Sequence, residues 1–469
     1  MPNSLAFLVL LSWPIVVVVL FRRLPVERAL IWSILGGYLF LPPVVAIDLP
    51  AVPPIDKMSI PALSAWLVCT LMLGHKVPLV PQTLAGRALF ALFIVTPIGT
   101  ALTNPEAIPV PFRPPLSGLT LYDSISIMAL QAFVLMTWAL GRRFLATAAA
   151  MRELLLALVV GGLIYSVPML IEIRLSPQMN VWIYGFFQHS FEQMVRFGGF
   201  RPIVFLAHGL WVAFFAMTAL LAAIALARSE PVKDRPRLML AVAYLAVLLV
   251  LCKSVGSLVY ALALAPLVFV GSQRMLITLA AAMALFALAY PILRAGGYVP
   301  VDWMLDQAGR ISPDRQQSLQ FRFDNEAMLL DHALRKPVFG WGGYERNLLH
   351  DPITGRVTTI SDGRWVIVLG IFGWCGYIAE FGISALPLLV LLRETRHIAS
   401  AAIAAPLGAL AVIHGVNMID MLPNATLTPL TWLISGALLG HAEALWAARR
   451  QAGRLRRSKA APGQSRTVL

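Results

Sequence analysis

Long apolar runs recur along the whole of this chain, and they restrict its fold more than any other feature. Many of them approach or exceed the roughly 18 residues that a helix needs to cross a bilayer. Because lipid offers no hydrogen-bond partners to the backbone, a spanning chain must be helical or a closed barrel. Barrel strands are only about 10 residues long and alternate in polarity. We therefore predict an all-α polytopic membrane protein with about 12 to 13 transmembrane helices.

The composition agrees with a membrane protein and argues against other classes. Hydrophobic residues make up 59% of the chain and charged residues only 13%, so few charges are left for a solvated surface. The formal net charge of +14 does not indicate nucleic-acid binding, because the basic residues lie at helix ends and in a C-terminal tail. The cysteines, Cys69, Cys252 and Cys375, lack metal-binding spacing. We expect no cofactor and no metal.

The apolar runs define the expected spans. They lie near residues 4–20, 29–47, 59–73, 84–101, 120–140, 153–171, 202–226, 238–252, 257–271, 275–291, 365–392, 398–420 and 426–446. The hairpin around Lys253 and Ser254 is the least clear division, because its two helices are short. Four regions follow from this division. They are N-terminal transmembrane helices in 1–293, a large loop in 294–364, C-terminal transmembrane helices in 365–446 and a basic tail in 447–469.

Basic residues occur in every second connection between these spans. These connections contain Arg22, Arg23 and Arg28; Lys76 and Arg87; Arg142, Arg143 and Arg152; Arg228, Lys233, Arg235 and Arg237; Arg274; and Arg393 and Arg396. Since Lys and Arg are enriched in cytoplasmic loops, we expect this side and the basic tail to be cytoplasmic. The protein would then lie in the bacterial cytoplasmic (inner) membrane, with its large loops facing the periplasm.

Two loops on the expected outer side are also rich in arginine. Residues 172–201 contain Arg196 and Arg201, and residues 294–364 contain Arg315 and Arg322. Because arginine matches phosphate with two parallel donors, these loops indicate an anionic ligand. The alternative is that a long extracytoplasmic segment needs charges for solubility.

The larger loop has the pattern of an amphipathic helix. Ser312 and Pro313 suit an N-cap and first helical position, and residues 314–334 space their leucines and phenylalanine helically. Arg315 and Arg322 are seven residues apart and share a face. Arg322 and Glu326 are four apart and would alternatively pair with each other.

Three short motifs follow this pattern. Residues 337–342 read Pro-Val-Phe-Gly-Trp-Gly; Asp362 and Gly363 precede, after nine residues, Gly-Trp-Cys-Gly at 373–376; and Lys253 begins Lys-Ser-Val-Gly-Ser at 253–257. With the many spans and one dominant loop, the chain resembles the O-antigen ligase and O-antigen polymerase superfamily of bacterial membrane glycosyltransferases. The resemblance covers residues 200–390 by motif and the rest by layout. It implies a C-type glycosyltransferase-like fold and a glycan linked to undecaprenyl pyrophosphate as substrate.

The chain departs from the family pattern at two positions. The usual loop histidine falls on Asp362, and the usual arginine of the third motif falls on Val255, with Lys253 as the nearest cation. Either Asp362 replaces the histidine as general base, or the protein kept the fold and changed its chemistry.

The reaction that the resemblance implies assigns roles to these residues. It is an inverting, metal-independent transfer, in which arginines absorb the charge of the leaving pyrophosphate and a base accepts a hydroxyl proton. The expected substrate-binding residues are Arg322, Arg315, Arg196, Arg201 and Lys253, and the expected catalytic residues are Asp362 and His350.

Each assignment has an alternative that the residues leave open. Arg315 and Arg322 would otherwise form a solvated helix face, Arg196 and Arg201 would anchor an interface, and Asp362 would cap the next helix. His332 is a further candidate base. The ionisable residues His208, His414 and Asp420 lie in or beside spans, where such groups are functional candidates or pair with neighbouring helices.

The resemblance favours a polymerase of surface polysaccharide slightly over a ligase. Membrane lipid and other polysaccharide assembly proteins are further expected partners. A lipid-linked glycan transporter or flippase is the first alternative, although the chain shows no internal repeat. A non-catalytic member of an assembly machine is the second, because fold does not fix function.

Overall fold

The computed structural model describes residues 1–49, 52–196 and 198–460, so the last nine residues of the expected tail lie outside the described part. Within the described residues, seven helices are long and apolar enough to cross a membrane. They are α1 (Ser4–Arg23), α4 (Leu84–Leu102), α5 (Leu121–Phe144), α6 (Ala148–Arg174), α8 (Gly209–Ser229), α11 (Gln273–Ala295) and α14 (Arg364–Thr395). The chain is therefore a multi-pass helical membrane protein, as the apolar runs predict.

Further helices complete the bundle. They are α2 (Val26–Phe40), α3 (Ile60–Leu67) with its π-helical continuation η1 (Val68–Met72), α9 (Arg235–Leu251), α10 (Val255–Val270), α15 (Ala405–Asp420) and α16 (Pro429–Ala460). Each expected span overlaps one of the bundle helices. The pairing of α5 with α16 is close because glycines let the two backbones meet. A side chain at Gly436 would strike the carbonyl of Trp138, and one at Gly440 would strike that of Arg142.

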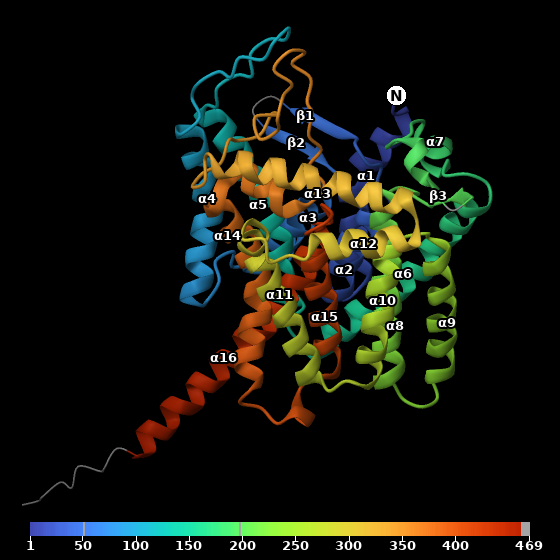
Figure 1. Cartoon of the computed structure of the whole chain (residues 1–469). Helices are drawn as coiled ribbons and strands as arrows, with labels where there is room; N and C mark the ends of the chain where they lie inside the picture. Colours follow the sequence, from blue (N-terminus) through green and yellow to red (C-terminus); the bar gives the residue numbers. More distant parts are fainter. Residues whose placement is uncertain (50–51, 197, 461–469) are drawn as a thin grey trace, which may run out of the picture.

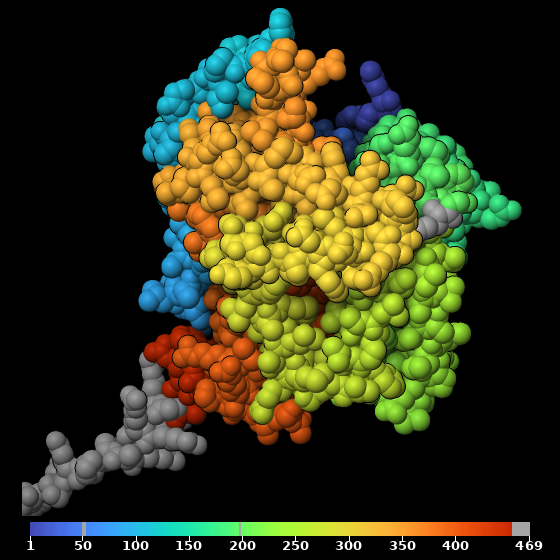
Figure 2. Space-filling view, viewed as in Figure 1, coloured from blue at the N-terminus to red at the C-terminus, as the bar shows by residue number. Residues whose placement is uncertain are grey.

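The long connections gather at one end of this bundle (Figure 1). The helices α12 (Val301–Ile311) and α13 (Pro313–Leu334) lie there, and α13 crosses the bundle rather than running along it. The same end carries α7 (Met179–Tyr184), η2 (Phe191–Met194) and two hairpins, β1 (Ala46–Leu49) with β2 (Val52–Asp56) and β3 (Val195–Arg196) with β4 (Gly199–Phe200). In Figure 2 residues of the large loop form a continuous yellow-to-orange band across this face. We call this the loop end.

Two of the expected spans are only partly helical, because one ends and the other begins in a non-helical segment. The span expected at 29–47 stops at Phe40, where α2 ends and β1 soon follows. The span expected at 202–226 begins only at Gly209, because residues 202–208 form a buried loop. In that loop the Glu172 carboxylate accepts hydrogen bonds from the backbone amides of Ile203 and Val204, both 2.8 Å long. A side chain thus replaces the partners that a helix would supply.

The helix α14 is sharply broken at Gly373. This residue has φ 63° and ψ −162°, a region of backbone conformation that is essentially restricted to glycine. Arg364 and Glu380 lie on opposite sides of the break, and their side chains form two hydrogen bonds of 2.6 Å. Sixteen residues of straight helix would place them roughly 24 Å apart. The two halves of α14 therefore fold toward each other.

The segment 337–342 fills the break and satisfies its backbone. The carbonyls of Gly370 and Ile371 accept from the amides of Trp341 and Gly342, at 2.8 and 2.9 Å. The amides of Trp374 and Cys375 in turn donate to the carbonyls of Pro337 and Val338, at 2.7 and 3.1 Å. Two of the sequence motifs thus pack against each other, and the hydrogen bonds that they exchange satisfy backbone groups that the break leaves without helical partners.

Candidate functional site

The helix α13 is held on the bundle by Glu326. The Glu326 carboxylate accepts from Nε of Arg294 on α11 at 2.7 Å and from the Tyr290 hydroxyl at 3.2 Å. Burial raises the pKa of Glu326, and the hydrogen bond from Arg294 opposes that shift. The Glu326 carboxylate is bound by Tyr290 and Arg294 of α11 and does not pair with Arg322. The alternative pairing of Arg322 with Glu326 along α13 is therefore wrong. Arg322 is directed elsewhere.

The side chain of Arg322 faces that of Asp362, which lies two residues before the start of α14. Nε of Arg322 lies 3.5 Å from Oδ2 of Asp362, and the two side chains are 40% and 42% exposed. The spacing is longer than a good charge-assisted hydrogen bond. The alternative role of Asp362 as a helix cap is also wrong, since Gly363 is the N-cap of α14 and no side chain caps it. Asp362 is a partly exposed carboxylate with one loose cationic neighbour.

Three further cationic side chains, from other segments of the chain, belong to the region of Arg322 and Asp362. Nζ of Lys253, in the turn between α9 and α10, donates to the carbonyl of Arg196 at 3.1 Å. Nη2 of Arg201 donates to the carbonyl of Lys253, also at 3.1 Å. The charges of Arg196 and Arg322 both act on Arg201. We call Arg196, Arg201, Lys253 and Arg322 the loop-end cation cluster.

Arg201 is the buried member of this cluster, with 8% of the residue exposed. Burial is the main cause that lowers its pKa, the positive charges of Arg196 and Arg322 add to the shift, and together they bring the pKa to about 10. The like charges are therefore held together at an energetic cost that an anion between them would relieve. This arrangement is what a site for a phosphate or diphosphate requires.

His208 adds a neutral donor beside the cations. Its Nδ1 accepts from the amide of Leu210 at 2.9 Å, so the proton is on Nε2, which lies 3.2 Å from Oε1 of Gln193. Burial lowers the pKa of His208 to about 3, with further contributions from His189 and the arginines. The two imidazole rings meet edge to face at 4.5 Å. His208 therefore stays uncharged near neutral pH.

Asp420 reaches the same region from the end of α15. Its carboxylate accepts from the Thr426 hydroxyl at 2.6 Å and from Nδ2 of Asn424 at 3.0 Å. The Tyr260 hydroxyl also interacts with it, and the charge of Arg322 acts on it. The sequence signal for Asp420 is an acidic residue at the end of an apolar span. That signal did not indicate that the charge of Arg322 acts on Asp420.

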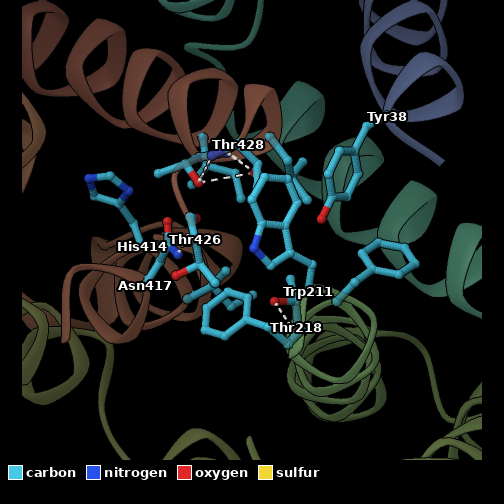
Figure 3. A pocket seen from close by; sticks show the side chains of 13 residues that line it. Tyr38, Trp211, Thr218, His414, Asn417, Thr426 and Thr428 are labelled. Atoms are coloured by element: carbon cyan, nitrogen blue, oxygen red, sulfur yellow. Dashed lines mark hydrogen bonds between the residues drawn. The ribbon is translucent and has the colours of Figure 1, made fainter. Parts of the chain in front are cut away.

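A narrow, mainly apolar pocket is lined in part by Thr426, whose hydroxyl donates to Asp420 (Figure 3). Tyr38, Trp211 and Phe214 form part of its wall, and Thr426 and Asn417 lie together on another part of it. Nδ2 of Asn417 donates to the carbonyl of Thr426 at 3.1 Å. His414 lines the same pocket and contacts the carbonyl of Ser384 through Nε2 at 2.7 Å. Thr426 therefore connects this pocket to the carboxylate of Asp420.

The remaining expected residues lie in two places. Arg315 lies on α13, about two turns before Arg322. His350 lies 3.6 Å from Glu345, in the loop after α13, and pairs its backbone with Val357. It acts electrostatically on His332, in the last turn of α13, rather than on the cation cluster.

His332 has a packing role. Its ring stacks on Trp341 with centroids 4.4 Å apart, and the Trp341 indole donates to the carbonyl of His332 at 2.7 Å. Burial lowers the pKa of His332. The described residues contain no group of three His, Cys, Asp or Glu side chains placed to hold a metal ion. The polar chemistry at the loop end is that of arginine, lysine and isolated carboxylates.

No protein-family profile matches this chain, and no curated protein matches it significantly.

Proposed function

We propose that this protein is a membrane glycosyltransferase of the O-antigen ligase and polymerase type, with the polymerase activity favoured. Its substrate would be a glycan linked to undecaprenyl pyrophosphate, used for a bacterial surface polysaccharide. One observation carries the proposal: four cations from three segments far apart in the chain meet beside an exposed carboxylate at the loop end. The motifs at 253–257, 337–342 and 362–376 support the same reaction.

The cations would bind the leaving group. The charges of Arg196 and Arg322 act unfavourably on Arg201, and a diphosphate bound among the three would neutralise that repulsion. Lys253 borders an apolar recess formed with Val250 and Leu258 on the lipid-facing side of the α9–α10 hairpin. The polyprenyl chain would lie along that recess, while its diphosphate reaches the arginines.

Asp362 would act as the general base. When the diphosphate takes over Arg322, the loose pair at 3.5 Å opens and the carboxylate is freed for the acceptor hydroxyl. The acceptor oxygen forms a bond to the anomeric carbon as the bond from that carbon to the phosphate oxygen breaks. The hydroxyl proton passes to Asp362, and undecaprenyl pyrophosphate leaves. Attack opposite the leaving group inverts the anomeric configuration.

Complementation with single variants tests this mechanism. In a strain lacking the protein, Arg322→Ala and Asp362→Asn are expected to reduce polymer synthesis by about 10² or more, because each removes a transition-state group. Polysaccharide chain length on gels at matched membrane expression is the readout. Arg335→Ala is the matched control, since Arg335 directly follows the same helix as its C-cap and forms an exposed pair with Asp331. His350→Ala is expected to retain activity.

Normal polymer length in both Arg322→Ala and Asp362→Asn would overturn the mechanism. That result would favour the two alternative functions, a lipid-linked glycan transporter and a non-catalytic assembly protein. A purified protein that extends a lipid-linked oligosaccharide in proteoliposomes separates an enzyme from both alternatives. In this proposal the cation cluster faces the periplasm from the bacterial cytoplasmic membrane, in keeping with the distribution of basic residues.

A further inference from the structure

A second cationic site lies at the opposite end of the bundle from the large loop. A recess opens where α8 and α10 end and α11 begins, and it measures about 830 Å³, counting the space at its mouth. Arg228, Ser272 and Ser400 line its polar side, and Leu276 and Ile403 line its apolar side. A neighbouring hollow shares Ser272 and Ser400 with it and continues along α11 past Arg274, Met275 and Leu279.

Arg228 in the recess and Arg274 in the neighbouring hollow are both held by backbone carbonyls. Nη1 of Arg228 donates to the carbonyls of Val268 and Gly271, at the end of α10. Nη2 of Arg274 donates to the carbonyls of Thr395 and Ile398, at 3.3 and 2.5 Å. These bonds fix the position of each guanidinium without neutralising its charge. A guanidinium has five N–H groups, and among the described residues nothing accepts from Nε of Arg274 or from Nε and Nη2 of Arg228.

Two carboxylates at this end of the bundle, Glu394 and Glu230, are already bound by other arginines. Glu394 accepts two hydrogen bonds from Arg449, at 2.7 and 2.9 Å. Glu230 accepts two from Arg152, at 2.5 and 2.9 Å. Within the described part of the chain, neither Arg228 nor Arg274 has a carboxylate oxygen within 4.0 Å. Two fixed positive charges therefore lie in adjoining hollows, and no carboxylate of the described residues pairs with either.

The mouth of the recess borders the surface that faces lipid. Phe269 and Val270, at the end of α10, are 51% and 70% exposed, and Met275, on the first turn of α11, is 39% exposed. Such side chains in a membrane protein contact acyl chains. A ligand in this recess would meet cations and hydroxyls at one end and hydrocarbon at the other.

We propose that this recess binds the phosphate headgroup of an anionic phospholipid. Arg228 and Arg274 contact the phosphate, the hydroxyls of Ser272 and Ser400 contact headgroup oxygens, and the acyl chains lie against Met275 and Leu279. Basic recesses between transmembrane helices recognise anionic headgroups in this way. The site is separate from the loop-end cation cluster and does not depend on the function proposed for that cluster.

Thermal melting of the full-length protein in a neutral detergent tests the proposal. Phosphatidylglycerol is expected to raise the melting temperature saturably, and phosphatidylcholine at the same concentration is not. Each of Arg228→Gln and Arg274→Gln is expected to weaken the phosphatidylglycerol response about fivefold in half-saturating concentration. Arg393→Gln is the control, because Arg393 is an exposed arginine at the same end of the bundle. Its response is expected to match that of the wild type.

A third variant covers the chance that losing either arginine destabilises the fold. Ser400→Trp fills the recess while leaving both sets of arginine–carbonyl bonds in place, and it is expected to abolish the phosphatidylglycerol response. An unchanged response in Ser400→Trp, or an equal response to phosphatidylcholine, would overturn the proposal. Competition by millimolar inorganic phosphate would also overturn it, since that result would identify a site for soluble phosphate.

Discussion

Two arginine–carboxylate pairs in this chain have members that are near neighbours in sequence, yet the pairs differ in atomic distance and in solvent exposure. Arg364 and Glu380 make two hydrogen bonds of 2.6 Å, and Glu380 is only 6% exposed. Arg322 and Asp362 are 3.5 Å apart and both more than a third exposed. Asp362 and Arg364 are separated by one residue, Gly363. The same two chemical groups thus serve as a tight bridge within α14 and as a loose contact at its mouth.

The difference indicates which pair stabilises the fold and which pair is accessible to a ligand. A buried pair that loses one partner leaves an uncompensated charge in an apolar environment. An exposed pair contributes little to stability, because water replaces the lost partner. The tight pair therefore holds the two halves of α14 together, and the loose pair can open without harming the protein.

The largest effect is expected from breaking the tight pair. Glu380→Ala should destabilise the protein by about 3–5 kcal/mol, since it strands the Arg364 guanidinium. The matched change Asp362→Ala should cost about 0–1 kcal/mol. Both are measured as shifts in thermal melting of purified protein in the same detergent. Equal shifts for the two variants would break the comparison.

The next effect concerns the turn that brings Arg364 to Glu380. In Gly373→Ala the new Cβ would lie 2.5 Å from the carbonyl oxygen of Pro337, and the residue would have to keep φ 63°. We expect a loss of about 2–3 kcal/mol from the backbone conformation, with the clash adding to it. Gly343→Ala is the control, because a Cβ there meets no heavy atom within 4 Å. A melting temperature unchanged by Gly373→Ala would show that the break does not depend on this glycine.

A smaller effect, on the pH dependence of stability, is expected from Lys57. This buried cation extends the comparison because it is bound by backbone carbonyls and not by a carboxylate. Nζ of Lys57 donates to the carbonyls of Leu41 and Phe205, both at 2.8 Å. Burial lowers the pKa of Lys57 from 10.5 to about 7, and the charge of Asp56 opposes that shift. Between these two values the unfolded chain binds more protons than the folded one, so stability should rise as the pH rises.

The variant Lys57→Met removes this contribution. Its melting temperature should vary less with pH between about 7 and 10 than that of the wild type, by a few degrees over the interval. Lys233→Met, at an exposed position after α8, is the control and should retain the wild-type slope. If the slopes of Lys57→Met and wild type coincide, Lys57 is not the group responsible.

Apolar runs were sufficient to predict the helices of the bundle, because hydrophobicity over about 18 residues identifies a span. They were not sufficient where an apolar segment is buried without being helical. Ile203, Val204 and Phe205 are apolar and buried like a helix interior, yet their amides bond to Glu172 and Tyr165 from α6. A side chain that replaces helical hydrogen bonds from another part of the chain leaves no local pattern.

The candidate site was predictable in its residue types and not in its pairings. Arginine-rich loops indicated Arg196, Arg201 and Arg322, and the structure brings all three together with Lys253. The partner of Glu326 depends on α11, which lies more than thirty residues away in sequence. Spacing along one helix therefore suggested the wrong pair. The contribution of Asp420 depends in the same way on where α15 ends in space.

The broken helix α14 has a consequence for how the chain is made. The groups that bond to the break, in residues 337–342, precede α14 in the chain and leave the ribosome first. The bent form can therefore be completed while α14 enters the bilayer, without waiting for later segments. An insertion between Leu334 and Gly343 would shift these groups out of register, so the length of this short stretch should be far less variable than that of the loop after it.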